Sequence, residues 1–279
     1  MPADSDVPDG SRLISSTANP RVKQLVALRR RRTRDETGLT LVDGIEELSL
    51  AIAAGVRPRE VFVCIDLLTP GEGTAVISRA RDLGAEIVHL TPGVFSRVAY
   101  REGPDGVLAT VPTPPTHLRD LAVTESPLLL VCQGIEKPGN LGAMLRTADA
   151  AGLDAVIATD PVTDVGNPNV IRASKGTVFA VPMATATTAA TLSWLESRDI
   201  RLVVTTPDTD QDYTDTDYTG GVAVAVGSEK HGVSDEVLAA ASARVRIPMR
   251  GRANSLNVAA SAAIVVYEAV RQRGASHAD

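Results

Sequence analysis

Apolar and polar residues alternate along the N-terminal part of the chain in blocks that predict strands and helices in turn. Short runs rich in β-branched residues, at 39–42, 60–64, 86–90 and 106–111, have the length of strands. Amphipathic runs at 45–54 and 75–83 each end at a glycine, a common helix stop, and the Asn19-Pro20 pair begins another helix. This alternation predicts a small α/β domain over residues 12–111.

A proline-rich stretch then predicts a domain boundary. Residues 112–116 read Pro-Thr-Pro-Pro-Thr, which is a stiff, extended sequence typical of a linker. We therefore expect a tail over 1–11, a first domain over 12–111, a linker over 112–118, a second domain over 119–273 and a tail over 274–279.

The alternation restarts after the linker. Residues 127–132 are continuously apolar, as in a strand that is covered on both faces, and strands are also predicted at 155–158, 201–205, 221–226 and 245–247. Residues 177–181 read as a further extended run. Helices are predicted at 140–151, 188–197, 233–241 and 255–273. This order predicts a mainly parallel sheet with ligand sites at the carboxyl ends of its strands.

Three strand-to-helix junctions of the second domain collect polar residues. In the first, residues 134–146, Asn140 is a candidate helix cap, and Arg146 lies off the apolar stripe of its helix. Arg146 therefore faces either a ligand or plain solvent. In the second, Gly227-Ser228-Glu229-Lys230-His231-Gly232, the carboxylate either meets a ligand or caps the next helix, although Ser234 and Asp235 are better placed for capping.

The third junction combines residues 247–249 with Asn254-Ser255-Leu256-Asn257. Ser255 is either an N-cap of the final helix or a site residue, because its hydroxyl suits both roles. Asn257 is less easily explained by capping. None of the three junctions contains a dinucleotide-binding GxGxxG, a Walker A lysine or a GxSxG elbow.

The charge distribution adds a candidate nucleic-acid surface. The net charge is −6, yet residues 12–34 contain no acidic residue. A local basic patch engages phosphates, whereas the alternative is a solvated helix face. With a single tryptophan, aromatic stacking cannot be the main mode of such contact. The basic residues of this stretch are Arg12, Arg21, Lys23, Arg29, Arg30, Arg31, Arg32 and Arg34.

Other features exclude several classes of protein. Cys64 and Cys132 lie in apolar runs and are expected to be buried, reduced thiols. The four histidines are scattered and no zinc-type spacing occurs, so no metal site is expected. The acidic N-terminus lacks the apolar core of a signal peptide, and no apolar run approaches the length of a membrane span. We therefore expect a cytoplasmic protein.

The three junctions resemble the three motifs of the SpoU/TrmH-type RNA 2′-O-ribose methyltransferases of the SPOUT superfamily. The matching segments are residues 140–148, 227–232, and 247–249 with 255–259, in the family's order and spacing, and residues 170–182 are similar to the stretch between the first two motifs. The N-terminal region is similar to that family's L30e-like RNA-binding domain at 15–22, 41–44 and 103–109.

The resemblance implies S-adenosylmethionine as cofactor, a trefoil knot in the second domain and a homodimer whose interface completes each active site. The implied cofactor-binding residues are Thr205, Gly227, Ile247 and Leu256. The implied catalytic group is Asn140, Arg146, Glu229, Ser255 and Asn257. With the resemblance, the basic patch is expected to bind RNA, and the expected contacts are Arg21, Lys23, Arg29, Arg30, Arg31, Arg32 and Arg172.

The resemblance leaves the substrate open. Family members with an L30e-like domain act on tRNA or on large-subunit ribosomal RNA, and several of the latter confer resistance to ribosome-directed antibiotics. We favour 23S ribosomal RNA, and the alternatives are a tRNA ribose methyltransferase and a non-catalytic RNA-binding protein of the same fold. We expect Arg146 to orient the substrate and stabilise the developing alkoxide, since arginine is a poor base. The sequence does not identify the methylated nucleotide or the general base.

Overall fold

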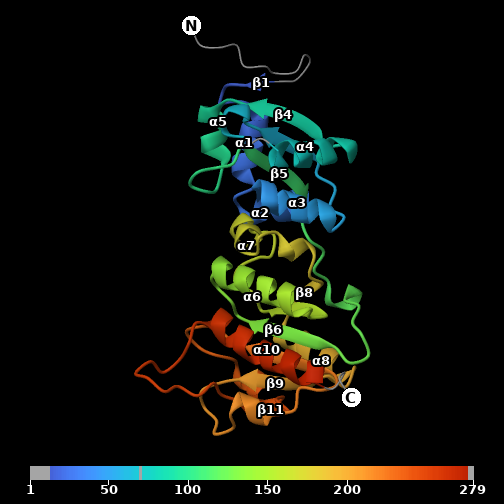
Figure 1. Cartoon of the computed structure of the whole chain (residues 1–279), viewed down its shortest axis with the longest axis vertical. Coiled ribbons are helices and arrows are strands. Elements are labelled where there is room, and N and C mark those ends of the chain that lie inside the picture. The colour runs from blue at the N-terminus through green and yellow to red at the C-terminus, as the bar shows by residue number, and fades with distance from the viewer. Residues whose placement is uncertain (1–12, 69–70, 276–279) are drawn as a thin grey trace. The chain divides into compact units, whose positions relative to one another are not determined.

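The computed structural model describes residues 13–68 and 71–275 (Figure 1). By contacts the chain divides into two compact units, the first formed by Met1–Pro114 with Val165–Ala180 and the second by Pro115–Asp164 with Val181–Asp279. The predicted tail over 1–11, Arg12 and most of the predicted tail over 274–279 lie outside the described residues. No helix in the described part of the chain has the length and hydropathy needed to cross a membrane.

The first unit is built on a five-stranded mixed sheet with the order β1-β4-β3-β5-β2. β5 pairs antiparallel with both β2 and β3, whereas β4 pairs parallel with β3 and β1. Its strands are β1 (Leu13–Ile14), β2 (Leu39–Asp43), β3 (Glu60–Val63), β4 (Glu86–Leu90) and β5 (Val107–Pro112). Its helices are α1 (Pro20–Ala27), α2 (Arg31–Thr37), α3 (Ile45–Ala53), α4 (Glu72–Asp82), α5 (Pro92–Val98) and α7 (Pro168–Ala173), with short 3-10 turns at Ile65–Leu67 and Thr177–Phe179.

The helix predicted to begin at Asn19-Pro20 contributes an apolar stripe to this unit's core. Asn19 caps α1, since its Oδ1 accepts the Arg21 N–H at 2.9 Å. Val22 and Leu25, and Leu28 just after the helix, are buried in one cluster with residues of β3, β4 and α5. The arginine run that follows, for which a solvated helix face was one of two interpretations, forms the helix α2, which ends at Gly38 in a left-handed conformation.

The second unit is built on a six-stranded sheet in which every described strand pair is parallel, as predicted, with the order β11-β9-β10-β6-β7-β8. Its strands are β6 (Leu128–Gln133), β7 (Ala155–Thr159), β8 (Met183–Ala186), β9 (Arg201–Thr205), β10 (Val222–Val226) and β11 (Ala243–Val245). Its helices are α6 (Pro138–Ala151), α8 (Thr188–Glu196), α9 (Asp235–Ala239) and α10 (Val258–Ala275), with short 3-10 turns at Leu118–Asp120 and Tyr213–Asp215.

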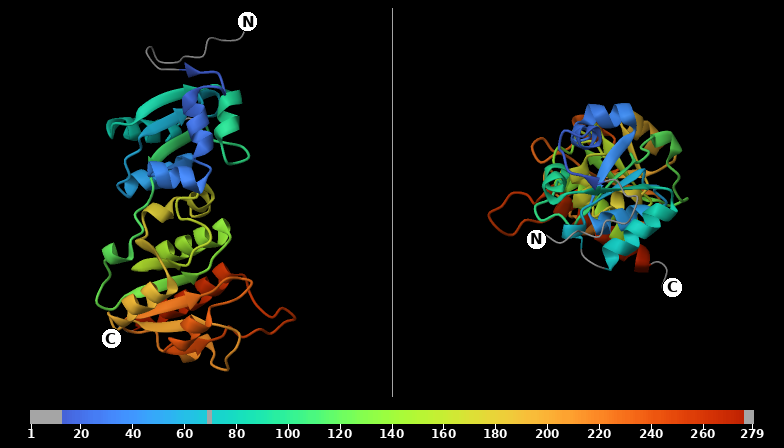
Figure 2. Two further views of the ribbon diagram at one scale, coloured as in Figure 1. Left: turned by 180° about the vertical axis from the view of Figure 1, so that it is seen from behind. Right: turned by 90° about the horizontal axis from the view of Figure 1, so that it is seen from above.

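Two pairs of helices cover this sheet. α6 and α10 contact each other, and α10 also contacts β6 and β10. α8 and α9 contact each other, and Trp194 and Val237 from them lie in the same apolar cluster as Leu129 and Val131 of β6. The middle of the segment between β11 and α10, residues 246–257, projects away from the rest of the unit (Figure 1 and Figure 2), whereas its ends are held, because Arg246 pairs with Asp212 and Asn257 contacts Glu229. This projecting loop carries the third of the sequence motifs.

One segment leaves the second unit and packs within the first. Residues 165–180 follow β7 in sequence, but Thr40 Oγ1 donates to the Gly166 carbonyl at 2.5 Å and Lys175 pairs with Glu46 at 2.5 Å. Gly176 has a φ of 84°, and a Cβ there would lie 2.9 Å from the Glu47 carbonyl oxygen. The extended run predicted at 177–181 is therefore wrong, because this turn is 3-10 and the strand forms later, as β8.

Candidate functional site

The carboxylate of Glu229 is the meeting point of the three sequence motifs. It lies in the loop after β10, and its Oε1 accepts hydrogen bonds from Asn140 Nδ2 at 2.8 Å and from Asn257 Nδ2 at 3.1 Å. The two amides also contact each other, with Asn257 Nδ2 3.2 Å from Asn140 Oδ1. Three predicted site residues, separated by up to 117 positions in the chain, thus form one cluster.

Asn140 is free to take part because it does not cap its helix. The sequence interpretation began this helix at Asn140, but α6 begins at Pro138, with Lys137 in the cap position. Proline at the first helical position is favoured because its missing N–H would have no partner there. Asn140 therefore lies within the first turn, where its side chain points to Glu229 rather than back to its own backbone.

Asn257, and not Ser255, caps the final helix. Asn257 Oδ1 accepts the backbone N–H groups of Ala259 at 3.0 Å and Ala260 at 3.4 Å, and α10 begins at Val258. Ser255 lies two residues too early to reach these amides, so of the two roles left open for Ser255 the helix cap is excluded. Asn257 does two things at once, since its carbonyl oxygen holds the helix and its amide nitrogen holds Glu229.

The surroundings of Glu229 keep it ionised. Lys137 Nζ donates a hydrogen bond to Glu229 Oε2, and this bond, followed by the one from Asn140, holds the pKa of Glu229 below its usual value. Glu229 does not cap the following helix. Ser234 does, through its Oγ and the Val237 N–H, as the sequence indicated.

Gly227 lets the Glu229 loop fold back on itself. Ser228 and Gly232 exchange backbone hydrogen bonds of 3.0 and 2.9 Å, which closes a tight turn around Glu229. A Cβ on Gly227 would lie 2.0 Å from the Gly232 carbonyl carbon, closer than any packed atom tolerates. This position therefore requires glycine for the loop geometry, whatever else its backbone binds.

The sequence interpretation missed a partly buried network next to the same loop. Gln133 ends β6, and its Oε1 accepts the Ser234 N–H at 2.8 Å while its Nε2 donates to Ser234 Oγ at 2.9 Å and to Thr188 Oγ1 at 2.7 Å. Thr188 in turn donates to Asp160 Oδ2 at 2.5 Å. The only signal in the sequence was a polar residue at the end of an apolar run. The network anchors the Glu229 loop to the sheet.

Arg146 and Ser255 form no hydrogen bond with the cluster around Glu229. Arg146 is exposed on α6, off the buried stripe as predicted, and its side chain forms no hydrogen bond or ion pair with any described residue. Ser255 is exposed on the projecting loop, and it too has no hydrogen bond within the described part of the chain. Both side chains are thus available to a molecule from outside the chain.

The expected cofactor residues lie at the ends of neighbouring strands. Thr205 ends β9, and its Oγ1 is buried without a hydrogen-bond partner among the described atoms. Ile247 follows β11, whose last residue, Val245, accepts the Thr206 N–H at 2.9 Å. Leu256 is 40% exposed on the projecting loop. An unpaired buried hydroxyl is a candidate partner for a polar group of a ligand, and an exposed leucine is a candidate apolar contact.

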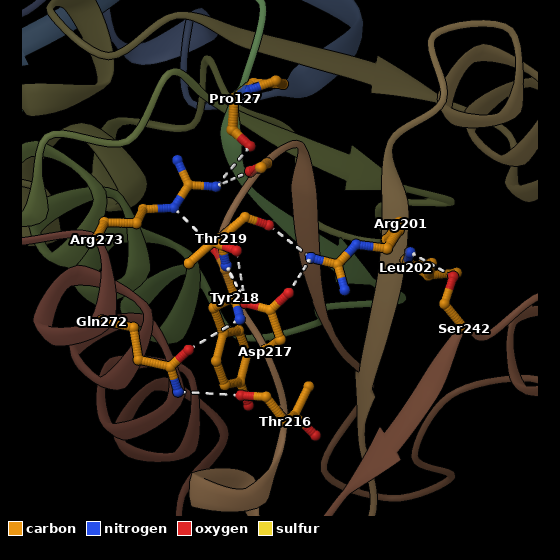
Figure 3. A network of polar contacts seen from close by, with 11 residues as sticks. Pro127, Arg201, Leu202, Thr216, Asp217, Tyr218, Thr219, Ser242, Gln272 and Arg273 are labelled. Carbon is orange, nitrogen blue, oxygen red and sulfur yellow. Dashed lines mark hydrogen bonds and ion pairs between the residues drawn. The ribbon is translucent and has the colours of Figure 1, made fainter. Parts of the chain in front are cut away.

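A polar network fixes the opposite, amino-terminal ends of β6, β9 and β10 (Figure 3). Arg273, near the end of α10, donates to the carbonyls of Pro127 at 3.1 Å and Tyr218 at 3.0 Å. Gln272 accepts the Tyr218 N–H at 3.0 Å, and Arg201 of β9 pairs with Asp217 at 3.4 Å. The loop that follows Thr205 is therefore tied to the sheet and to the last helix.

In the first unit, most of the predicted RNA-binding arginines already have partners. Arg21 pairs with Glu86 at 2.8 Å and with Glu60 at 3.3 Å. Arg29 donates to the Ala99 carbonyl at 3.1 Å and stacks over Tyr100, with 4.9 Å from guanidinium carbon to ring centre. Because of these contacts, the dense run of basic residues leaves few cationic side chains without a partner.

The rest of the basic stretch divides into paired and free residues. Arg31 and Arg32 face acids one helical turn later, at 3.6 and 2.7 Å. Arg34 is only 2% exposed and donates to the Leu28 carbonyl at 2.8 Å. Lys23 and Arg30 are exposed, and their side chains form no hydrogen bond or ion pair with described residues. They are the most available cations of this stretch.

Arg172 was expected to reach RNA phosphate. It lies in α7, is half-buried, and donates to the Tyr100 carbonyl at 3.2 Å within the first unit. Within the described residues, no group of histidine, cysteine or acidic side chains is arranged to hold a metal ion.

Comparison with known proteins matches both halves of the chain. A sequence model of the SpoU rRNA Methylase family matches residues 127–267, and one of an MRM3-like substrate binding domain matches residues 19–109. The 23S rRNA (uridine(2479)-2′-O)-methyltransferase of Streptomyces viridochromogenes is 32% identical, over 92% of this chain and 92% of that protein. The 23S rRNA (guanosine(2553)-2′-O)-methyltransferase RlmP of Bacillus subtilis is 29% identical, over 91% and 97%.

The fold matches as well. The crystal structure of an AdoMet-bound rRNA methyltransferase from Sinorhizobium meliloti superimposes with a TM-score of 0.85 at 30% identity, covering 94% of this chain and 98% of that one. The similarity therefore extends over both units and is not confined to the three motifs.

Proposed function

We propose, because the chain belongs to the SpoU rRNA methylase family, that it transfers a methyl group from S-adenosylmethionine to a ribose 2′-hydroxyl of 23S ribosomal RNA. One observation carries the proposal for this chain's own residues. Asn140, Glu229 and Asn257, one from each motif, meet in a single hydrogen-bonded cluster beside the carboxyl ends of the parallel strands. A fold without catalysis needs no such convergence of polar groups.

The residues present fit the cofactor. Thr205 offers a buried, unpaired hydroxyl, Ile247 and Leu256 offer apolar surface, and Gly227 leaves the backbone of its loop close to the strand ends. The AdoMet-bound relative of similar fold supports the same assignment. When bound, S-adenosylmethionine supplies an electrophilic methyl group on a sulfonium.

The chain's own residues would position the acceptor and stabilise its charge. Methyl transfer is an in-line displacement, so alignment of the reacting groups contributes much of the rate. Arg146 would donate hydrogen bonds to the developing alkoxide and the adjacent phosphate, since its guanidinium stays charged and is otherwise unengaged. Ser255 would hold the hydroxyl, and Glu229 would hold the amides of Asn140 and Asn257 in place.

We extend the proposal to a homodimer with the family's trefoil knot. Ser255 and Leu256 lie on a loop that projects from its own unit (Figure 2), as expected for a segment that meets a second copy. In this proposal the partner completes the site and Arg172 exchanges its Tyr100 contact for RNA phosphate. Light scattering of the purified protein tests the dimer, and a monomer at micromolar concentration would contradict it.

Ribosomal RNA is favoured over tRNA because the named relatives that align over most of the chain act on 23S rRNA. The match to a substrate binding domain model supports RNA recognition by residues 12–111, with catalysis by 119–273. A ribosomal substrate supports the proposal that the enzyme acts in the cytoplasm. The link to antibiotic resistance stays a prediction.

Two assays test the function. Calorimetry with S-adenosylmethionine should show binding, and labelled methyl groups should enter 23S fragments as 2′-O-methylnucleosides. Transfer into tRNA in place of 23S fragments would favour the tRNA enzyme. Absence of both cofactor binding and transfer, with RNA binding retained, would favour a non-catalytic RNA-binding protein.

A further inference from the structure

Lys137 occupies a position that ordinarily disfavours lysine. It holds the N-cap position of α6, where its side chain makes no capping hydrogen bond. Lysine has no acceptor for the free N–H groups, and its charge faces the positive end of the helix dipole. At a functional site, a residue that is unfavourable for the local secondary structure usually makes a compensating interaction with another part of the molecule.

The compensating partner is Glu229. Lys137 Nζ bonds to Oε2, which leaves Oε1 to the amides of Asn140 and Asn257. The lysine side chain is 67% exposed and the glutamate 32% exposed. An ion pair so open to water contributes little to folding stability. Its consequence is geometric, because it divides the two carboxylate oxygens between a cation on one side and two amides on the other.

We propose that Lys137 is a positioning residue of the methyl-transfer site, whose ammonium group fixes Glu229 so that Oε1 faces Asn140 and Asn257. This inference rests on the proposed function. Asn257 also caps α10 through its Oδ1, so the orientation of Glu229 is linked to the start of that helix. Without the ammonium group, the carboxylate is free to rotate toward solvent and release the amides.

The groups that face Glu229 make this dependence specific. From the start of α6 come Lys137 and Asn140, and from the segment before α10 comes Asn257. On its own loop, Lys230 and His231 are exposed and have no side-chain bond to Glu229 in the described structure. Lys137 is also the largest influence that lowers the pKa of Glu229. Removing it should let Glu229 take up a proton at higher pH.

Kinetics of the full-length protein test the inference with Lys137→Gln, Lys137→Arg and a matched control, Lys230→Gln. With 23S fragments varied at saturating S-adenosylmethionine, Lys137→Gln should lower kcat about tenfold with little change in the KM for RNA. In the pH profile of kcat, the acid limb of Lys137→Gln should lie at higher pH than that of the wild type. Lys137→Arg should restore most of the rate. Lys230→Gln should behave as wild type.

A raised KM for RNA at unchanged kcat would overturn the inference, because it would show that Lys137 contacts phosphate directly. Equal losses in Lys137→Gln and Lys230→Gln would overturn it too, since they would reflect loop charge in general.

A second readout does not depend on activity. The carboxyl carbon of Glu229, assigned by comparison with Glu229→Gln, is titrated by ¹³C NMR in the wild type and in Lys137→Gln. The inference expects the pKa of Glu229 to rise in the variant, and identical titrations would reject it. If that rise occurs while the wild type transfers no methyl group, the pairing stands and the proposed function fails.

Discussion

The two units use their polar side chains in opposite ways. In the first unit, arginines of one basic stretch have different partners, since Arg21 pairs with Glu86 and the buried Arg34 donates to backbone carbonyls. In the second unit, residues far apart in sequence converge on Glu229, while Arg146 is left without a partner. A run of charged residues in the sequence is therefore weaker evidence for a binding site than contacts in the structure between residues that are far apart in the sequence.

The acids of the two units show the same contrast. Glu47 of α3 is 3% exposed, with Oε2 unpaired, and burial raises its pKa. Glu229 is reached by a cation and two amides, and its pKa is lowered. Four experiments can break or sharpen this comparison.

The largest effect is expected at Arg146. Replacing Arg146 with alanine should lower turnover at saturating RNA about a hundredfold or more, because a donor to developing charge is lost. Arg119→Ala is the matched control, since Arg119 is an exposed arginine of the same unit whose ion pair is with its neighbour Asp120 at 3.6 Å. Methyl transfer measures both variants. Near-full turnover of Arg146→Ala would remove Arg146 from the site.

The next effect concerns the loop that presents Glu229. Gly227→Ala should lower the unfolding free energy by about 1–3 kcal/mol, because the new methyl group would collide with the backbone of Gly232. Gly139→Ala is the control, since a Cβ there meets no atom within 4 Å. Thermal unfolding measures both. Equal stability of the two variants would show that the loop relaxes without cost and that Gly227 is not needed for its geometry.

A smaller effect is expected for RNA binding by the first unit. Lys23→Ala and Arg30→Ala should each weaken binding and reduce the slope of log affinity against log salt by about one. Arg34→Ala should lower stability and leave the slope unchanged, because its guanidinium is buried. Binding titrations from low to moderate salt measure the slopes. A slope change for Arg21→Ala as large as that for Lys23→Ala would show that the Arg21 ion pairs open on RNA binding.

The smallest effect is the pH dependence of the first unit. Because burial raises the pKa of Glu47 in the folded state, its contribution to stability is present below the ordinary pKa of 4.5 and is lost as pH rises through the raised value. Glu47→Gln removes this loss, so the Tm of the variant relative to wild type should increase with pH. Melting curves from acid to neutral pH measure it. The opposite trend would show that Arg101 stabilises the carboxylate more than burial opposes it.

Much of the fold was predictable because long apolar runs leave few alternatives. β6 and β10 are continuous apolar stretches and formed within a residue of where the pattern placed them. The segment 165–180 was not predictable in the same way, since its turn depends on Gly176 packing against Glu47 in the first unit. The local sequence pattern does not predict such tertiary contacts.

The candidate site was predictable by residue type and motif order, but not by contact. Ser255 and Asn257 are both good capping residues, and only the start of α10 decides between them. Likewise, Gln133 became part of the site's support because β6 ends beside the Glu229 loop. Its role depends on the pairing of β6 with β10, which joins residues some ninety positions apart.

The most direct test of the methyltransferase assignment is a map of ribose methylation on total RNA. It compares a strain that lacks this protein with the same strain complemented by the wild type or by Arg146→Ala. The account predicts that one 2′-O-methylated nucleotide of 23S ribosomal RNA disappears, returns with the wild type and stays absent with the variant. Unchanged ribosomal and transfer RNA in the deletion strain, or full restoration by Arg146→Ala, would contradict it.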